Sequence, residues 1–276
     1  MVDPKEMTAA TIASRELQQA GMESSPNQES LYRFRNGSYV LYVTLAANCV
    51  LLDDSDYGFP PAIRNILPRT IDTSYNHAFI DSFGIATFSI REFKGVTTLW
   101  HNTKIDIIPL PVVRAIKANC FKVQYDGDWA IAKFARFDWE IRFIETETAI
   151  YQTIDEHNIA PKFLGHLHEN GRVVGLLLAY MEGRRPQTEQ DYGMCASVLS
   201  RLHNLGLVHG DVNLDNFIVT GIEAKLVDFE TCRSGTVDER MMEVKRLERE
   251  FEEDSRRGAL ADEGEDYEEG EYPIGI

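Results

Sequence analysis

The segment at residues 191–230 constrains the fold of this chain more than any other part of it. Residues 191–205 carry apolar side chains at helical spacing, and Gly206 is a typical helix stop. A polar loop with the sequence HGDVNLDN follows at residues 209–216. Two short apolar runs joined by Thr220-Gly221 then predict a hairpin over residues 217–228. The segment therefore reads as a helix, an acidic loop and a hairpin.

Three oxygen-bearing side chains lie at fixed points of this segment. Asp211 is on the loop, Asn216 opens the hairpin and Asp228 closes it, in the sequence DFE. Asp and Asn also favour turns for backbone reasons alone, so a chance turn is the alternative explanation. The hairpin spacing nevertheless predicts that the three side chains line one cleft.

HGDVNLDN followed by DFE resembles the catalytic loop and metal-binding motif of protein-kinase-like enzymes. The glycine after the histidine is similar to aminoglycoside phosphotransferases and to the small kinase of the tRNA-modifying KEOPS complex. The resemblance implies that Asp211 is the catalytic base, Asn216 a metal ligand and Asp228 the main Mg²⁺ ligand, with ATP as the phosphoryl donor.

The resemblance also requires a lysine on a strand, followed by a helix that carries a glutamate. Residues 129–134, WAIAKF, are similar to the family's V-A-I-K strand and imply that Lys133 contacts the α- and β-phosphates of ATP. The next predicted helix is capped by Asp138 and runs to about residue 157. Its candidate partners for Lys133 are Glu147, then Glu145, then Glu140, which lies close to the helix start.

An apolar run at residues 176–183, LLLAYMEG, resembles the last strand of the kinase N-lobe and the hinge. Backbone groups of an extended hinge read the edge of adenine in that family. The resemblance therefore assigns the Ala179 carbonyl and the Met181 amide to adenine. An ordinary core strand is the alternative for residues 176–178.

Several positions depart from the family pattern. No GxGxxG precedes Lys133, and the corresponding turn, RAIKAN, offers only Lys117 or Asn119 near the phosphates. Gly210 replaces the arginine of H-R-D, and Asn213 stands where Ser/Thr kinases keep a lysine. DFG has become DFE. These changes predict weak phosphate cradling and one missing cation at the γ-phosphate.

The expected fold is α+β, a two-lobed protein-kinase-like fold with a shortened C-lobe. Only 48 residues follow Asp228, without an APE motif, so the resemblance is to minimal RIO-like and KEOPS-type kinases and covers residues 112–254. We expect five segments along the chain: a flexible leader at 1–30, a β-rich N-terminal extension at 31–111, a kinase N-lobe at 112–180, a short helical C-lobe at 181–257 and an acidic tail at 258–276.

Composition limits the partners. The net charge is −16, and residues 248–271 hold twelve acidic against three basic side chains. An acidic body argues against nucleic acid as a partner. The four cysteines form no CxxC or Cys/His cluster, so no zinc site is predicted. The sequence offers no apolar run of eighteen residues and no signal peptide, which predicts no membrane contact and a cytoplasmic or nuclear location.

The expected function is transfer of the ATP γ-phosphate, with Mg²⁺, to Ser or Thr of a protein substrate. A small-molecule hydroxyl is the first alternative acceptor, because HGD loops are common in that group. A nucleotide-binding pseudokinase scaffold is the second alternative, since the glycine loop is absent.

Overall fold

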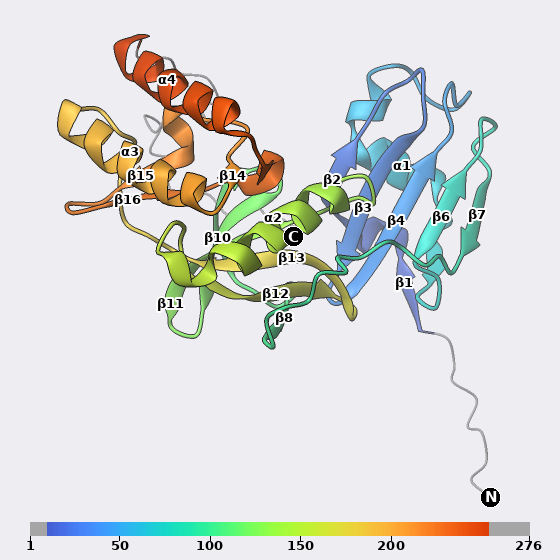
Figure 1. The fold of residues 1–276 in the computed structure, drawn as a ribbon. Helices are drawn as coiled ribbons and strands as arrows, with labels where there is room; N and C mark the ends of the chain where they lie inside the picture. Colours follow the sequence, from blue (N-terminus) through green and yellow to red (C-terminus); the bar gives the residue numbers. More distant parts are fainter. Residues whose placement is uncertain (1–9, 254–276) are drawn as a thin grey trace, which may run out of the picture. The chain divides into compact units, whose positions relative to one another are not determined.

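The computed structural model describes residues 10–253, a mixed α+β chain that divides into two compact units. The first described unit comprises residues 10–93 and the second comprises residues 94–253. Both units are built on a twisted sheet, and the second also carries the three longer helices. Figure 1 traces both units along the chain. Each unit has a hydrophobic core of its own.

The first unit is a five-stranded sheet in the order β2-β3-β4-β6-β7, beside a two-stranded sheet of β1 and β5. Only the β4–β6 pair is parallel, and helix α1 lies within that crossover. The bounds are β1 (Thr11–Ala13), β2 (Gln18–Glu23), β3 (Ser30–Asn36), β4 (Tyr39–Leu45), α1 (Pro60–Ile66), β5 (Thr70–Asp72), β6 (His77–Ile80) and β7 (Ala86–Ser89), with single 3-10 turns at Ser14–Glu16 and Asp56–Gly58.

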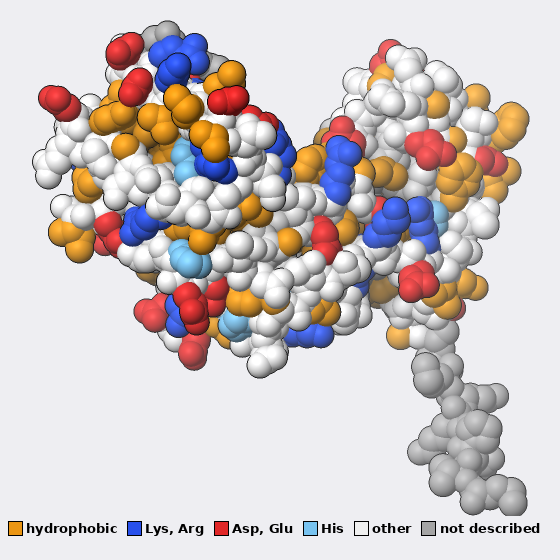
Figure 2. All heavy atoms as spheres, viewed as in Figure 1, with side chains coloured by type: hydrophobic (Ala, Val, Ile, Leu, Met, Phe, Trp, Pro, Cys, Tyr) orange, Lys and Arg blue, Asp and Glu red, His pale blue; other side chains and the backbone are white. Residues whose placement is uncertain are grey.

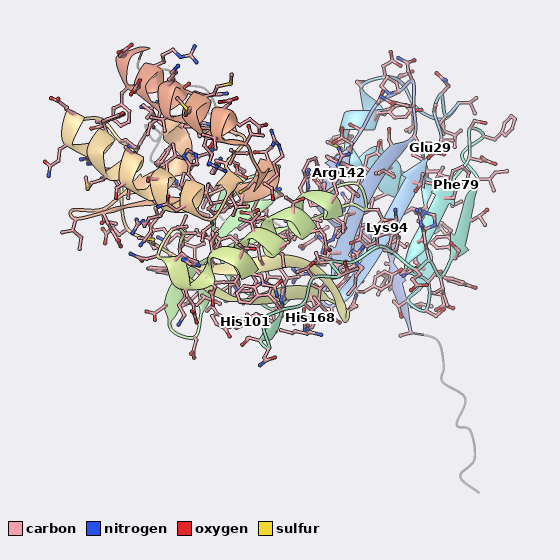
Figure 3. All side chains as sticks on the ribbon, in the orientation of Figure 1. Glu29, Phe79, Lys94, His101, Arg142 and His168 are labelled. Atoms are coloured by element: carbon pink, nitrogen blue, oxygen red, sulfur yellow. The ribbon has the colours of Figure 1, made fainter. Side chains whose placement is uncertain are left out.

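Alternation of side chains along β3 and β4 builds the core of this unit. Tyr32, Phe34, Leu41 and Val43 are fully or almost fully buried, and Ile63 of α1 packs into the same cluster. The outer edge is different, because Phe79, Phe83 and Ile85 of the β6–β7 hairpin are exposed. Figure 2 shows hydrophobic side chains on this surface, and Figure 3 labels Phe79 on β6.

The second unit begins with a six-stranded sheet in the order β8-β12-β13-β11-β10-β9. All neighbours are antiparallel except β8 and β12. Two tight hairpins, at Asp126-Gly127 and Asn170-Gly171, have positive φ at both central residues, as their sequences predict. The bounds are β8 (Lys104–Asp106), β9 (Val112–Lys117), β10 (Cys120–Tyr125), β11 (Asp128–Phe134), β12 (Phe163–Glu169) and β13 (Arg172–Ala179).

Helices and two small two-stranded sheets, β14-β17 and β15-β16, complete the second unit. Helix α2 packs on β13, and α3 packs against α4 and against β15 and β16 (Figure 1). One continuous core runs from the sheet through α2 to α3. The bounds are α2 (Ile141–Ile154), α3 (Glu189–Asn204), β14 (Leu207–Val208), β15 (Phe217–Val219), β16 (Ala224–Leu226), β17 (Arg233–Ser234) and α4 (Val237–Glu253), with 3-10 turns at Asp155–His157, Leu214–Asn216 and Phe229–Thr231.

Two expected boundaries differ from the structure. Residues 10–30 of the flexible leader expected at residues 1–30 contain strands, because β1 pairs with β5 and β2 pairs with β3. The β-rich extension ends at residue 93 rather than 111, since β8 joins the sheet of the second unit through β12. The strands of the β1–β5 and β8–β12 pairs are distant in the sequence, whereas β2 and β3 are neighbours along the chain. The expected acidic tail, 258–276, lies outside the described residues.

The expected cap of α2 is also wrong. Glu140 holds the N-cap position, without a side-chain cap, and the Asp138 carboxylate lies 3.5 Å from the Arg172 guanidinium instead. By contrast, Thr188 caps α3 through a reciprocal capping box with Asp191. Within residues 10–253, no helix has the length and apolar character needed to cross a membrane.

Gly175 tests how tightly β13 packs on β11. A Cβ at this position would lie 2.4 Å from the Lys133 carbonyl oxygen and 2.6 Å from Phe134 Cβ, so Gly175→Ala must push the two strands apart. We expect it to lower the free energy of unfolding by about 1–3 kcal/mol, the usual cost of overpacking. Urea denaturation followed by tryptophan fluorescence measures this unit, because all three tryptophans lie within it.

The matched control is Gly193→Ala on the exposed side of α3. No atom lies within 4 Å of the added Cβ there, so the change should stabilise the helix by about 0.5–1 kcal/mol. Equal effects of the two substitutions would show that the packing at Gly175 is not as tight as described.

Candidate active site

A buried lysine ties three elements of the second unit together. Lys133 on β11 has only 7% of its surface exposed. Its Nζ lies 2.7 Å from Glu147 Oε2 on α2, which confirms the predicted ion pair. The same Nζ lies 2.6 Å from Asp228 Oδ1 and 2.8 Å from Glu230 Oε1, both at the end of the β15–β16 hairpin. One ammonium group therefore meets three carboxylates.

The ionisation of these groups follows from burial and mutual attraction. Burial would lower the pKa of Lys133, but the three carboxylates outweigh it and raise that pKa well above its ordinary value. Burial raises the pKa of Glu147, although Lys133 opposes the rise. Burial would also raise the pKa of Asp228, but attraction to Lys133 and Lys117 lowers it to about 2. Asp228 is thus a carboxylate at neutral pH.

The two other candidate partners of Lys133 lie elsewhere. The Glu145 carboxylate accepts hydrogen bonds from the backbone and hydroxyl groups of Thr97 and Thr98. Glu140 binds the guanidinium of Arg136 at 2.6 Å and caps the nearby backbone. Both acids hold backbone segments against the N-terminal half of α2. Glu147 is therefore the acid of α2 that faces the cluster.

The loop at residues 209–216 holds Asp211 by its own amides. Asp211 Oδ2 accepts hydrogen bonds from Asn213 Nδ2 at 3.0 Å and from Asn216 Nδ2 at 3.1 Å. Asn216 Nδ2 also donates to the Asp211 carbonyl at 2.9 Å, which leaves Asn216 Oδ1 for another partner. About half of the Asp211 side chain is exposed, so Oδ1 remains accessible. The loop thus presents one fixed carboxylate to solvent.

Backbone contacts bring this loop next to the lysine cluster. The amide of Val227, the residue before Asp228, donates to the Asn216 carbonyl at 3.0 Å. The fully buried His209 ring bonds the Val227 carbonyl at 3.0 Å, and burial lowers the pKa of His209. The structure therefore brings Asp211, Asn216 and Asp228 close together.

Helix α4 fixes the start of the loop through Glu243, which the sequence analysis missed. Its carboxylate accepts from the backbone amides of His209 at 3.1 Å and Gly210 at 2.7 Å, and pairs with His203 Nε2 at 2.8 Å. Burial would raise the pKa of Glu243, but these hydrogen bonds outweigh it and lower that pKa. The only signal in the sequence was an acid on the apolar side of an amphipathic helix.

Two residues of the motifs, Gly210 and Asp228, have a left-handed backbone conformation. Gly210 has φ of +85°, and a Cβ there would lie 2.5 Å from the Thr231 carbonyl oxygen, so no side chain fits. Asp228 has φ of 68° and ψ of 65°, a left-handed conformation that Asp tolerates better than most residues. Left-handed non-glycine residues cluster at functional sites. Gly210 is therefore a steric requirement of this loop.

Glu230 adds a charge that the sequence analysis did not assign, and Lys117, one of the two candidates named in the turn, also reaches the cluster. Oxygen atoms of Glu147, Asp228 and Glu230 lie within 4.8 Å of one another, an arrangement that offers hard oxygen donors to a divalent cation. Lys117 Nζ, from the turn that replaces the glycine loop, lies 3.0 Å from Asp228 Oδ2. Asn119, the other candidate in that turn, contributes its carbonyl to the amide of Phe134.

The two residues assigned to adenine lie together but apart from this cluster. The Ala179 amide donates to the Lys162 carbonyl, and the Tyr180 amide donates to the Trp129 carbonyl. Ala179 and Met181 line a cavity of about 300 Å³ with Ile154, Lys162 and Lys225, among others, and none of the lysine cluster lines it. The adenine assignment remains a prediction.

His101, His166 and His168 lie together near β8 and β12, away from the lysine cluster. The His166 ring accepts a hydrogen bond from the His101 amide at 3.2 Å, and burial lowers the pKa of His166 to about 4. Figure 3 labels His101 and His168 close to β8 and β12. A neutral, buried ring suits packing against Trp100 and Phe163.

Comparison with known proteins adds no relative. No model of a known protein family matches the chain, and no curated protein sequence is similar to it.

Glu243→Gln tests whether α4 positions the loop. A glutamine amide offers one oxygen in place of two and brings its own N–H donors, so at least one backbone amide of the loop loses its acceptor. Each buried donor without a partner costs about 1–3 kcal/mol. We expect a loss of this size in the free energy of unfolding, measured by urea and tryptophan fluorescence. Glu252→Gln, exposed on the same helix, is the control and should change little.

The lowered pKa of Asp228 predicts an acid-sensitive contribution to stability. A carboxylate with a pKa near 2 in the folded state and near 4 in the unfolded chain stabilises the fold above pH 4, by about 2 kcal/mol. This contribution is lost as the pH falls from about 4 to 2. The stability difference between the parent protein and Asp228→Asn should therefore shrink over that range in urea denaturation. A difference that is constant with pH would contradict the assignment.

Proposed function

We propose that residues 94–253 form a two-lobed protein-kinase-like fold with a short C-lobe, and that the chain is an ATP-dependent phosphotransferase. The observation that carries this proposal is the contact of Lys133 Nζ with both Glu147 Oε2 and Asp228 Oδ1, at 2.7 and 2.6 Å. A lysine on a sheet strand, a glutamate on the next helix and an aspartate after the catalytic loop are the parts that hold ATP in this class.

The arrangement of elements supports the fold. The antiparallel sheet with α2 corresponds to a kinase N-lobe, and the extended segment after β13 corresponds to the hinge. Helices α3 and α4, with the β15–β16 hairpin, correspond to a reduced C-lobe. Resemblance of fold alone says little about chemistry, so the argument for activity rests on the side chains of the site.

The side chains have chemistry that suits phosphoryl transfer. Lys133 would bind the phosphates of ATP, and Glu147 would keep its ammonium oriented. Asp211, fixed by Asn213 and Asn216, would accept the proton of the acceptor hydroxyl at its exposed Oδ1. Its position half in solvent leaves room for an acceptor.

The donor set also fits a divalent metal. The ionised Asp228 carboxylate and the unused Asn216 Oδ1 would hold Mg²⁺, with Glu230 as a further oxygen donor close to Asp228. Bound Mg²⁺ neutralises charge on the phosphates of the nucleotide. Asn216 would thereby serve both the metal and the orientation of Asp211.

The proposed acceptor is Ser or Thr of a protein in the cytoplasm or nucleus. The exposed Asp211 supports a large acceptor, whereas a small-molecule hydroxyl is the other acceptor to be screened. Two observations favour a nucleotide-binding scaffold instead: Lys133 is already shared among three carboxylates, and no glycine loop precedes it. The experiment below separates these functions.

Asp211→Asn is the deciding substitution. A catalytic carboxylate acts mainly in the transition state, so its loss should lower phosphotransfer by about 10²-fold or more and leave Mg·ATP affinity nearly unchanged. Asp228→Asn should lower both, because it removes a charge from the metal site. Radiolabelled phosphotransfer and calorimetry measure the two quantities.

Asp128→Asn is the matched control, on an exposed strand end, and should alter neither. If the parent protein binds Mg·ATP but transfers phosphate to no protein, small molecule or water, the enzyme proposal fails and the nucleotide-binding scaffold is the function that remains. A parent protein that binds no Mg·ATP would remove the proposal altogether.

A further inference from the structure

Arg246 of α4 lies next to Asp211, although the two residues are 35 positions apart in the sequence. The helical spacing of three residues puts Arg246 on the same side of α4 as Glu243, which holds the loop. One guanidinium nitrogen of Arg246 lies 3.7 Å from Asp211 Oδ1. The Arg246 side chain is 34% exposed and that of Asp211 is 48% exposed. The pair is therefore open to solvent and to ligands.

The contact between the two side chains is loose. A separation of 3.7 Å exceeds a hydrogen bond, and the buried Nε of Arg246 has no hydrogen-bond partner among the described residues. Arg184 of the same unit is different, because it binds Asp191 with two nitrogens at 2.8 and 3.0 Å. Arg246 therefore keeps donors that its neighbours do not use.

Other cations around the site are committed to carboxylates. Lys133 serves three acids, Lys117 lies 3.0 Å from Asp228, and Arg185 lies 2.8 Å from Asp215. Asn213, two residues after Asp211, carries no charge, and its side-chain amide donates a hydrogen bond to Asp211 Oδ2. Phosphoryl transfer spreads negative charge over three equatorial oxygens and requires a cation beside them.

We propose that Arg246 binds an oxyanion beside Asp211 and supplies the cation that the catalytic loop lacks. The inference rests on the proposed phosphotransferase function. In the reaction, the acceptor hydroxyl gives its proton to Asp211 Oδ1, and its oxygen forms a bond to the γ-phosphorus. The bond from the γ-phosphorus to the bridging oxygen breaks, and that electron pair leaves on ADP. Arg246 pairs with the non-bridging oxygens, which suit the planar guanidinium.

The oxyanion has two possible sources with the same chemistry. One is the phosphoryl group in transit from ATP. The other is a phosphate or carboxylate carried by the acceptor next to its hydroxyl. The first source makes Arg246 act on the transition state of every acceptor, whereas the second makes it act on the affinity for anionic acceptors.

The experiment compares Arg246→Gln, Arg246→Lys and the control Arg249→Gln, which changes an exposed arginine three residues further along α4. For each full-length variant we would measure kcat, KM for the acceptor, and affinity for Mg·ADP with and without aluminium fluoride. Mg·ADP with aluminium fluoride imitates the phosphoryl group in transit, and it provides a readout that needs no turnover.

If the γ-phosphoryl group is the source, Arg246→Gln lowers kcat and affinity for the fluoride complex by about 10²-fold, the scale of one lost transition-state donor. Mg·ADP affinity stays unchanged, and Arg246→Lys recovers part of the loss because the positive charge remains. If an acceptor anion is the source, Arg246→Gln raises the KM for the acceptor instead, while kcat and affinity for the fluoride complex stay unchanged. Either result supports an oxyanion site at Arg246.

Two results would overturn the inference. Arg246→Gln that matches Arg249→Gln in every measurement would show that no oxyanion contacts Arg246. An equal loss of Mg·ADP and fluoride-complex affinity would show that Arg246 only supports the fold. These results are distinct from failure of the proposed function, in which the parent protein itself binds no Mg·ATP.

Discussion

The candidate site depends on the ion pairs that the Lys133 ammonium group makes with three carboxylates. Removing a charge from water costs several kcal/mol unless partners replace the water, and here Glu147, Asp228 and Glu230 do so at 2.6–2.8 Å. The three acids come from α2 and from the end of the β15–β16 hairpin. The lysine thus joins the sheet, the helix above it and the hairpin. Three carboxylates against one ammonium leave two negative charges, and Lys117 offsets one of them.

A second set of contacts holds the loop that faces this cluster. Glu243 binds the backbone of His209 and Gly210, and His209 binds the carbonyl before Asp228. The position of Asp211 is therefore set from α4, while the position of Asp228 is set from the sheet. The Val227–Asn216 backbone bond connects the two halves. Under the proposed function, proton acceptance and metal binding would be tuned by different elements of the fold.

Local patterns predicted the elements better than they predicted the charges between them. Asp126-Gly127 and Asn170-Gly171 specify their hairpins through φ alone, and the spacing of Lys133 and Glu147 follows from a strand and its next helix. The contact of Lys117 with Asp228 joins residues 111 positions apart, so no local pattern reveals it. Strand β2, QQAGME, escaped prediction because its side chains are mostly polar or small and it lies at the edge of its sheet.

Two departures from the kinase-like motifs share one physical consequence. Under the proposed function they leave a need for positive charge, at the phosphates where the glycine loop is absent and near the acceptor where Asn213 replaces lysine. In the folded chain, Lys117 at the end of β9 lies 3.0 Å from Asp228, and Arg246 of α4 lies 3.7 Å from Asp211. Charge acts through distance in space and not through position in a motif. A motif comparison counts both positions as losses of charge, whereas under the proposed function Lys117 and Arg246 would supply that charge from other elements.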